Sequence, residues 1–251
     1  MEELARQAII NGVDIMTVTD HVDLSDGLTG KRNSYAFDIW PDMEYDFYEA
    51  AMSVKDKLDL RIGIELGEAN HFPDFGRKVA GTSGLDFVIG STHNLRNTMD
   101  FYVLKYESMD ECHRYVEMYL DELLEVAKLG FVDVLGHVGY TRRYMKRAGF
   151  EINFDDYRDK LIEIFKAAVQ SGTGIEINTS GIRQGLGSTI PTYAQAKLYK
   201  DCGGEIITVG SDAHFPKDIG SDIKDAYAAL RDIGFKYVAV FKSRKPEFIK
   251  I

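Results

Sequence analysis

Ionisable residues that can bind metal or move protons stand at the ends of several apolar runs in the sequence. The run "IITVG" at residues 206–210 leads directly into Asp212 and His214. Earlier apolar runs finish in the same way, and the residues at their ends are Asp20, His21, Glu65, His93 and His137. If these runs are parallel strands, their carboxyl ends meet at one rim, where α/β barrels place their active sites.

Imidazoles mixed with carboxylates are ligands for zinc, iron or manganese. No cysteine stands at these strand ends, so the pattern does not favour a closed structural zinc site. A single histidine at a strand end is usually only a surface residue, and it is the recurrence of the pattern that indicates metal. Such a cluster could hold two or three ions, lower the pKa of a bound water and assist phosphoryl transfer.

The order of apolar and amphipathic segments predicts an α/β fold. Short runs rich in Val and Ile, as buried parallel strands are, occupy residues 13–20, 60–66, 85–92, 131–137, 173–180, 205–212 and 236–241. Amphipathic stretches with helical spacing lie between them, and two of these are followed by Gly130 and Gly172 as expected helix caps. Strands that alternate with helices in this way favour a barrel over a doubly wound open sheet, which remains the alternative.

Length and composition limit the classes of protein to consider. The 251 residues suit one α/β domain, which we predict over residues 1–251. No apolar run is long enough to span a membrane, and the acidic start "MEELARQ" is unlike a targeting peptide. With only two isolated cysteines, Cys112 and Cys202, a reducing cytoplasmic location is expected.

The net charge of −10 disfavours a general nucleic-acid binder. A negative net charge is still compatible with a small phosphorylated ligand that arginines bind locally. The oligomeric state is left open.

The strand-end motifs "TVTDH", "GIE", "GSTH", "DVLGH" and "GSDAH", in this order, resemble those of the PHP (polymerase and histidinol phosphatase) superfamily. The segments "EINTSGIR" and "GHVGYTRRY" are similar to its histidinol-phosphatase branch. The resemblance extends from residue 1 to about residue 240. It implies a distorted (β/α)7 TIM-like barrel, and hydrolysis of L-histidinol phosphate to L-histidinol and phosphate, a step in histidine biosynthesis.

The resemblance also implies a site for two or three divalent transition metals, either zinc, iron or manganese. Its ligands would be His21, Glu65, His93, His137, Asp212 and His214. Glu65 would bridge two metals, and His93 and His137 would complete one site. Asp212 would serve another metal, and the two remaining histidines would hold a third or lie beside it.

Roles in catalysis and substrate binding follow from the same resemblance. Asp20 or His214 would protonate the leaving group, and Arg142 and Arg183 would bind the substrate phosphate, a task that suits the planar guanidinium. Arg143, adjacent to Arg142, is expected to make a surface ion pair. Glu176, in the run at 173–180, can point either into the site or behind it, and this is left open.

Two features depart from the family pattern. The family opens with a strand ending in His-x-His, but no histidine precedes His21 in this chain. We therefore expect the barrel to lack its first strand, to be open between its first and last strands, and to bind fewer than three metals with reduced activity. We favour a missing upstream segment over a true loss. The second departure is Gly139, which stands where the family often carries Asp.

Three alternatives remain at this point. They are a PHP phosphoesterase for another small phosphate monoester or nucleotide, a nuclease-type or polymerase-associated PHP domain, and a non-catalytic PHP module. The aromatic residues Tyr35, Phe37 and Trp40 follow the His21 run, and we expect them to pack against a helix rather than cover the site.

Overall fold

The computed structural model describes residues 1–33 and 40–251. Of the aromatic residues expected to pack against a helix, Tyr35 and Phe37 lie outside the described residues. Trp40 is buried at the start of the helix α2.

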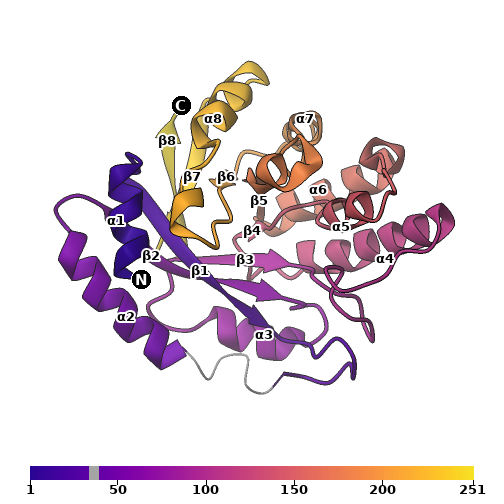
Figure 1. Ribbon diagram of the computed structural model, residues 1–251, viewed down its shortest axis with the longest axis horizontal. Helices are drawn as coiled ribbons and strands as arrows, with labels where there is room; N and C mark the ends of the chain where they lie inside the picture. The colour runs from indigo at the N-terminus through magenta and orange to yellow at the C-terminus, as the bar shows by residue number, and fades with distance from the viewer. Residues whose placement is uncertain (34–39) are drawn as a thin grey trace.

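Strands and helices alternate along the chain, with the helices lying around the outside of the strands (Figure 1). The strands are β1 (Ile15–Asp23), β2 (Asp59–Gly67), β3 (Phe87–Ser91), β4 (Val134–Leu135), β5 (Gly174–Asn178), β6 (Ile207–Gly210), β7 (Tyr237–Lys242) and β8 (Lys245–Lys250). The α-helices are α1 (Glu2–Ile10), α2 (Trp40–Val54), α3 (Pro73–Ala80), α4 (Met109–Ala127), α5 (Thr141–Arg147), α6 (Arg158–Ser171), α7 (Tyr193–Asp201) and α8 (Ile223–Asp232). Each of the predicted apolar runs overlaps a strand, so the predicted order of elements is confirmed.

Strands β1 to β6 form one parallel sheet in sequence order. In the part of the chain that the structure describes, β1 and β6 each pair with a single neighbour, so the sheet has two open edges. The sheet is curled into a partial barrel (Figure 1). This architecture confirms the predicted distorted TIM-like fold, including its opening between the first and last strands of the sheet.

The seventh predicted strand differs from the expectation. Instead of extending the parallel sheet, β7 pairs antiparallel with β8. Strand β8 was not predicted from the sequence. A two-residue turn, Ser243–Arg244, joins them, and both residues have positive φ angles of 48° and 64°. Hairpin turns of this kind usually carry Asn-Gly or a similar pair, so "SR" gave no turn signal.

Tertiary contacts hold this unusual turn in place. Asp86, the residue before β3, accepts hydrogen bonds from the backbone N–H groups of Ser243 (2.8 Å, side chain) and Arg244 (3.0 Å, carbonyl). The Arg244 guanidinium binds both carboxylate oxygens of Asp133, the residue before β4, at 2.6 and 3.1 Å. The hairpin is therefore anchored at the amino-terminal ends of two strands of the main sheet.

Burial follows the predicted pattern of an α/β core. Strand β3 is buried along its whole length, and β2 is buried beyond its first residue, as parallel strands covered on both faces are. The helices contribute apolar stripes to the same core, for example Val116, Leu120 and Leu123 of α4. Helix α6 ends at Gly172 in the left-handed conformation, as predicted, whereas α4 ends at Ala127, before Gly130. Within the described residues, no helix combines the length and apolar character needed to cross a membrane.

Replacing Arg244 by leucine should destabilise the fold. Asp133 is largely buried, and burial already raises the pKa of its carboxyl against the opposing effect of Arg244. Removing one partner of such a pair leaves a buried charge and typically costs about 3–5 kcal/mol. Urea denaturation of the Arg244→Leu variant should show a loss of this size in the free energy of unfolding.

The matched control is Arg231→Leu, which removes an exposed guanidinium from α8. Surface changes of this kind usually alter the free energy of unfolding by about 0.5 kcal/mol or less. Equal losses for the two variants would show that the Arg244–Asp133 pair does not anchor the hairpin.

Candidate metal centre

The carboxylate of Glu65 on β2 is shared by two histidines from neighbouring strand ends. His93 follows β3 by two residues, and its Nε2 lies 3.1 Å from Glu65 Oε1. His137 follows β4 by two residues, and its Nε2 lies 2.7 Å from the same oxygen. The two Nε2 atoms are 3.4 Å apart. We call Glu65, His93 and His137 the Glu65 cluster; it confirms that these strand ends converge.

The side chains of the Glu65 cluster are buried, and Glu65 and His93 each strongly affect the pKa of the other. Burial opposes the charged form of Glu65, but the adjacent imidazoles of His93 and His137 hold the pKa of its carboxyl well below the usual range. Burial likewise opposes a charged His93, yet Glu65 and Asp23 hold the pKa of its imidazole well above the usual value. Ser91 adds a hydrogen bond of 2.6 Å from its hydroxyl to Glu65 Oε1.

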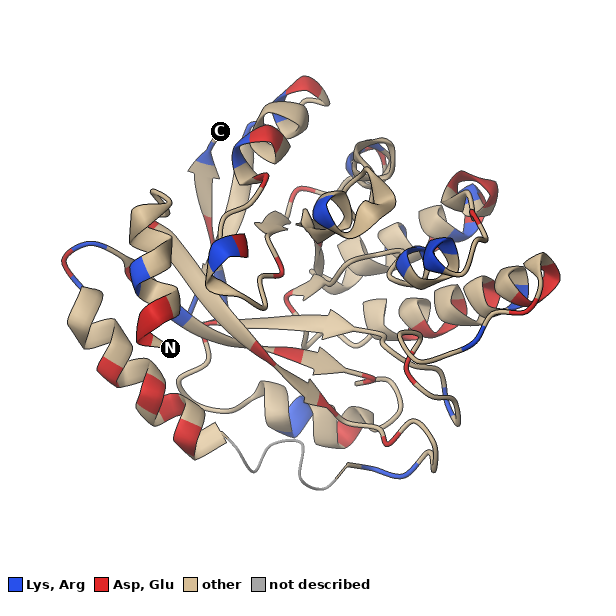
Figure 2. Cartoon of the chain, viewed as in Figure 1, with Lys and Arg blue, Asp and Glu red and all other residues tan. Residues whose placement is uncertain are grey.

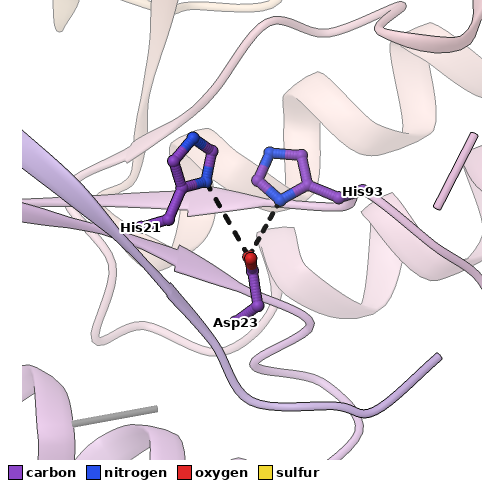
Figure 3. Close-up of side chains that lie close together, drawn as sticks. All are labelled: His21, Asp23 and His93. Carbon is purple, nitrogen blue, oxygen red and sulfur yellow. Dashed lines mark hydrogen bonds and ion pairs between the residues drawn. The ribbon is translucent and has the colours of Figure 1, made fainter. Parts of the chain in front are cut away.

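Asp23 is a member of the site that the sequence analysis missed. Strand β1 continues to Asp23, and its Oδ1 lies 3.0 Å from His93 Nδ1 and 4.0 Å from His21 Nδ1. Figure 3 shows both imidazoles turned toward this carboxylate. A Cβ atom at Gly67, which pairs with Asp23 in the sheet, would overlap Asp23 Oδ1, so the glycine makes room for it. The two-residue period of the strand, extended past His21, would have pointed to Asp23.

His93 presents a different nitrogen to each neighbour. In the described part of the chain, the groups with ligand spacing are His21–Asp23–His93 and Glu65–His93–His137. A neutral imidazole accepts a metal at one nitrogen and carries its proton on the other. With Nε2 bound to a metal, the imidazole would carry its proton on Nδ1 and donate it to Asp23, the arrangement by which carboxylates orient metal-binding histidines.

Asp20 lies apart from this arrangement. It is exposed, and the alternation of β1 places it on the strand face opposite His21 and Asp23. Among residues 1–33 and 40–251, no hydrogen bond or ion pair joins Asp20 to the Glu65 cluster. His21 itself pairs in register with Glu65, and its Nε2 lies 3.7 Å from Glu65 Oε2.

The predicted ligand Asp212 lies in a neighbouring polar cluster. It follows β6 with a positive φ of 49°, and its Oδ2 lies 3.0 Å from Ser180 Oγ and 3.5 Å from Arg143 Nη2. His214 Nδ1 lies 3.4 Å from Asp212 Oδ1, and the His214 side chain is 61% exposed. We call Asp212, Ser180, Arg143 and His214 the Asp212 cluster. Outside residues 34–39, neither Asp212 nor His214 belongs to a group with ligand spacing.

Two residues of β5 lie between the two clusters. Glu176 is buried, and its Oε2 accepts the backbone N–H of His137 at 3.0 Å. Burial is the main cause that raises the pKa of its carboxyl to about 7. The question left open for Glu176 is thereby answered, since it points toward the site. Asn178 donates from Nδ2 to Glu176 and to Asp212, at 3.2 Å in both cases.

The three arginines have distinct environments. Arg143 is buried and donates to Ser180 Oγ at 2.7 Å, so the expected surface ion pair for Arg143 is wrong. Arg142 instead lies over the ring of Phe154 at 5.9 Å. Within the described residues its Nε and Nη1 are buried without a hydrogen-bond partner, and burial lowers its pKa. Arg183 donates to the carbonyls of Ser211 and Asp212, which places its guanidinium at the end of β6.

Positive charge gathers beside the site on an acidic protein. Helix α5, "TRRYMKR", carries basic residues and no acidic ones, whereas α2 carries a row of acidic residues (Figure 2). Tyr140, just before α5, packs against the rings of His93 and His137 with centroids 5.1 and 4.7 Å away. Helix α5 therefore begins directly at the Glu65 cluster.

The donor set fits divalent metal ions. Two imidazole nitrogens and one carboxylate oxygen approach one another closely at the end of a rigid sheet, with further carboxylates and His21 beside them. Nitrogen and oxygen donors of this kind bind zinc and related ions. The site is therefore suited to divalent metal.

The curled parallel sheet and the imidazole–carboxylate cluster at its carboxyl ends define a metal-binding α/β protein of the TIM-like class. The pattern of the PHP domain family matches residues 1–180. The chain belongs to the PHP domain family.

Known proteins of this kind are similar to the chain over most of its length. The "Probable histidinol-phosphatase" of Clostridium acetobutylicum is 28% identical over 224 residues, 88% of this chain and 83% of that protein. The "Histidinol-phosphatase" of Lactococcus lactis subsp. lactis is 28% identical over 263 residues, 97% of this chain and 90% of that protein. A crystal structure of histidinol phosphate phosphatase from Lactococcus lactis, complexed with zinc, L-histidinol and phosphate, superimposes with a TM-score of 0.77 at 23% identity, over 98% and 91% of the two chains.

The variants Asp23→Asn and Asp20→Asn test the two faces of β1. The amide oxygen of asparagine accepts a hydrogen bond from His93 Nδ1–H less strongly than the carboxylate of Asp23 does. Loss of such a partner typically weakens metal affinity about 10- to 100-fold. Zinc affinity, measured by competition with a chelating indicator, should fall by this factor for Asp23→Asn. Asp20→Asn should leave it unchanged, and an equal effect of both changes would refute the assignment of Asp23.

Proposed function

We propose that the chain is a metal-dependent phosphomonoesterase that hydrolyses L-histidinol phosphate to L-histidinol and phosphate. The observation that carries the proposal is the Glu65 cluster, at the carboxyl ends of the strands of a PHP fold. The names of the most similar proteins and the ligands of the Lactococcus lactis structure support the choice of substrate. One apolar core cluster contains residues from Ala5 to Val238, which supports one PHP domain over residues 1–251.

The metals proposed are two or three divalent ions, of which zinc has the support of the Lactococcus lactis structure. The residues that would hold them are His21, Glu65, His93, His137, Asp212 and His214. When bound, such ions lower the pKa of a coordinated water and neutralise phosphate charge. Because His93 and His137 both face Glu65 Oε1, the Glu65 cluster is the best-formed part of this ligand set.

The substrate phosphate would be held by arginines at the rim. Arg143 is the better placed of the adjacent pair, because its guanidinium lies in the Asp212 cluster whereas that of Arg142 lies over Phe154. Arg183 is fixed by the carbonyls of Ser211 and Asp212, so its guanidinium also lies beside Asp212. A planar guanidinium can meet two phosphate oxygens at once and stabilise the charge of the transition state.

Where His214 lies beside the third metal rather than binding it, its imidazole would supply the proton for the leaving alkoxide. Its side chain is exposed, lies beside Asp212 and has its ring centroid 6.0 Å from that of His21, so it can reach a substrate at the rim. Asp20, the other candidate, is on the opposite face of β1 and is less well placed. General acid catalysis by a positioned side chain typically contributes about 10²- to 10⁴-fold to the rate.

Phosphate release tests the proposed reaction. The zinc-loaded and manganese-loaded proteins should hydrolyse L-histidinol phosphate with a kcat/KM well above that for serine phosphate, glycerol phosphate or adenosine monophosphate. Glu65→Gln should lower kcat/KM by more than about 100-fold, since it removes a shared ligand rather than an outer partner. The control Glu205→Gln changes an exposed residue and should be without effect. Faster hydrolysis of another ester in the panel would reassign the substrate.

The variants Arg143→Met and Arg142→Met separate the adjacent arginines. Loss of hydrogen bonds between an arginine and the phosphate should cost about 1.5–3 kcal/mol, or roughly 10- to 150-fold in kcat/KM. We expect this loss for Arg143→Met and a much smaller one for Arg142→Met. The reverse order would show that Arg142 binds the phosphate, as the spacing of the family motif implies.

A further inference from the structure

Asn178, the last residue of β5, uses every hydrogen-bonding position of its side-chain amide. Its Nδ2 donates to Glu176 Oε2 and Asp212 Oδ2, each at 3.2 Å. Its Oδ1 accepts the backbone N–H of Ser180 at 3.0 Å and also the Ser180 hydroxyl. The two donors and two acceptor sites of an asparagine amide are thereby all engaged.

These partners fix the orientation of the amide. Turning it over would place Oδ1 against two carboxylates and the NH₂ group against the N–H of Ser180. Both contacts would be repulsive, so the partners themselves decide which atom is nitrogen. The NH₂ group faces Glu176 and Asp212.

The backbone of Asn178 is held as firmly as its side chain. Its N–H and carbonyl exchange hydrogen bonds of 2.9 Å with the carbonyl and N–H of Ile190. The next residue, Thr179, donates its N–H to the carbonyl of Gly210 on β6 at 2.9 Å. Only 1% of its surface is exposed, so Asn178 is a rigid point between β5 and β6.

Each carboxylate that Asn178 holds belongs to a different half of the site. Glu176 accepts the backbone N–H of His137 and so connects to the Glu65 cluster. Asp212 is the centre of the Asp212 cluster, with Arg143 and Ser180 around it. Without a donor between them, the two carboxylates would face each other in a buried region, where like charges repel strongly.

We propose that Asn178 is a positioning residue that holds the Glu65 cluster and the Asp212 cluster in one fixed arrangement, so that metal ions can engage both. The inference rests on the proposed function only in taking both clusters as parts of one metal site. The competing explanation is that Asn178 merely fills space. The two explanations predict opposite orders for two substitutions.

The test compares zinc affinity in Asn178→Ala and Asn178→Asp. Loss of the amide should weaken binding about 10- to 100-fold in the alanine variant, as for other partners behind metal ligands. Aspartate has nearly the same shape as asparagine but no donor, and it adds a third negative charge. Zinc affinity should therefore fall further in the Asn178→Asp variant than in the alanine variant. If the Asn178→Asp variant binds zinc as well as the unaltered chain, or better than the Asn178→Ala variant, the residue only fills space and the proposal fails.

A compensating change keeps the test decisive if Asn178→Asp is poorly folded. In the double variant Glu176→Gln with Asn178→Asp, the number of negative charges returns to that of the unaltered chain, while the glutamine side-chain oxygen can still accept the N–H of His137. The thermal midpoint and the zinc affinity should both recover relative to Asn178→Asp alone. No recovery in either quantity would overturn the proposal.

The control is Asn153→Asp, the same substitution at an exposed helix cap where the aspartate oxygen can still accept the capping N–H of Asp155. Zinc affinity is measured without substrate, so its outcome is separate from the proposed reaction. A chain that binds zinc in the predicted order but does not hydrolyse L-histidinol phosphate would retain the role of Asn178 and lose the function. A chain that hydrolyses L-histidinol phosphate but shows the reverse order of zinc affinities would retain the proposed function and lose the role of Asn178.

Discussion

The buried carboxylate of Glu65 is the interaction on which the site depends. Placing an ionised carboxylate in the interior is costly unless opposite charge and hydrogen bonds compensate it. His93, His137 and Ser91 supply this compensation from the ends of β3 and β4. The arrangement holds only if these strands keep their register with β2, so the parallel sheet and the site stabilise one another.

Further carboxylates contact the two histidines of the Glu65 cluster. Asp23 holds the outer nitrogen of His93, and Glu176 holds the backbone of His137. His93 is thus held through its imidazole, and His137 through its backbone N–H. Glu68 acts similarly, accepting the backbone N–H of His93 at 2.7 Å, and its burial raises the pKa of its carboxyl to about 8. These acidic residues therefore have different roles. Asp23 contacts an imidazole nitrogen, whereas Glu176 and Glu68 accept backbone N–H groups of the histidines.

The sheet itself is incomplete as a barrel. The open edges at β1 and β6 lie at the two ends of the strand order, while the β7–β8 hairpin packs Phe241 and Ala239 against Phe87, Ile89 and Val134. This packing covers apolar side chains of β3 and β4, and the buried Arg61 of β2 forms an ion pair of 2.7 Å with the exposed Glu247 of β8. The C-terminal hairpin thus contributes to the stability of the strands that carry the Glu65 cluster.

The sequence by itself determined the order of strands and helices and the residues at the strand ends. Both are local properties: apolar runs of Val and Ile specify buried strands, and His93, His137 and Glu65 stand at fixed offsets from them. Pairing with distant residues was decided only by the tertiary structure. Which of Arg142 and Arg143 reaches Asp212 depends on how α5 is set against β5 and β6, and the turn at Ser243–Arg244 depends on Asp86 and Asp133. Asp23 falls between these cases, because strand alternation implies its face but only the fold brings His93 within 3.0 Å of it.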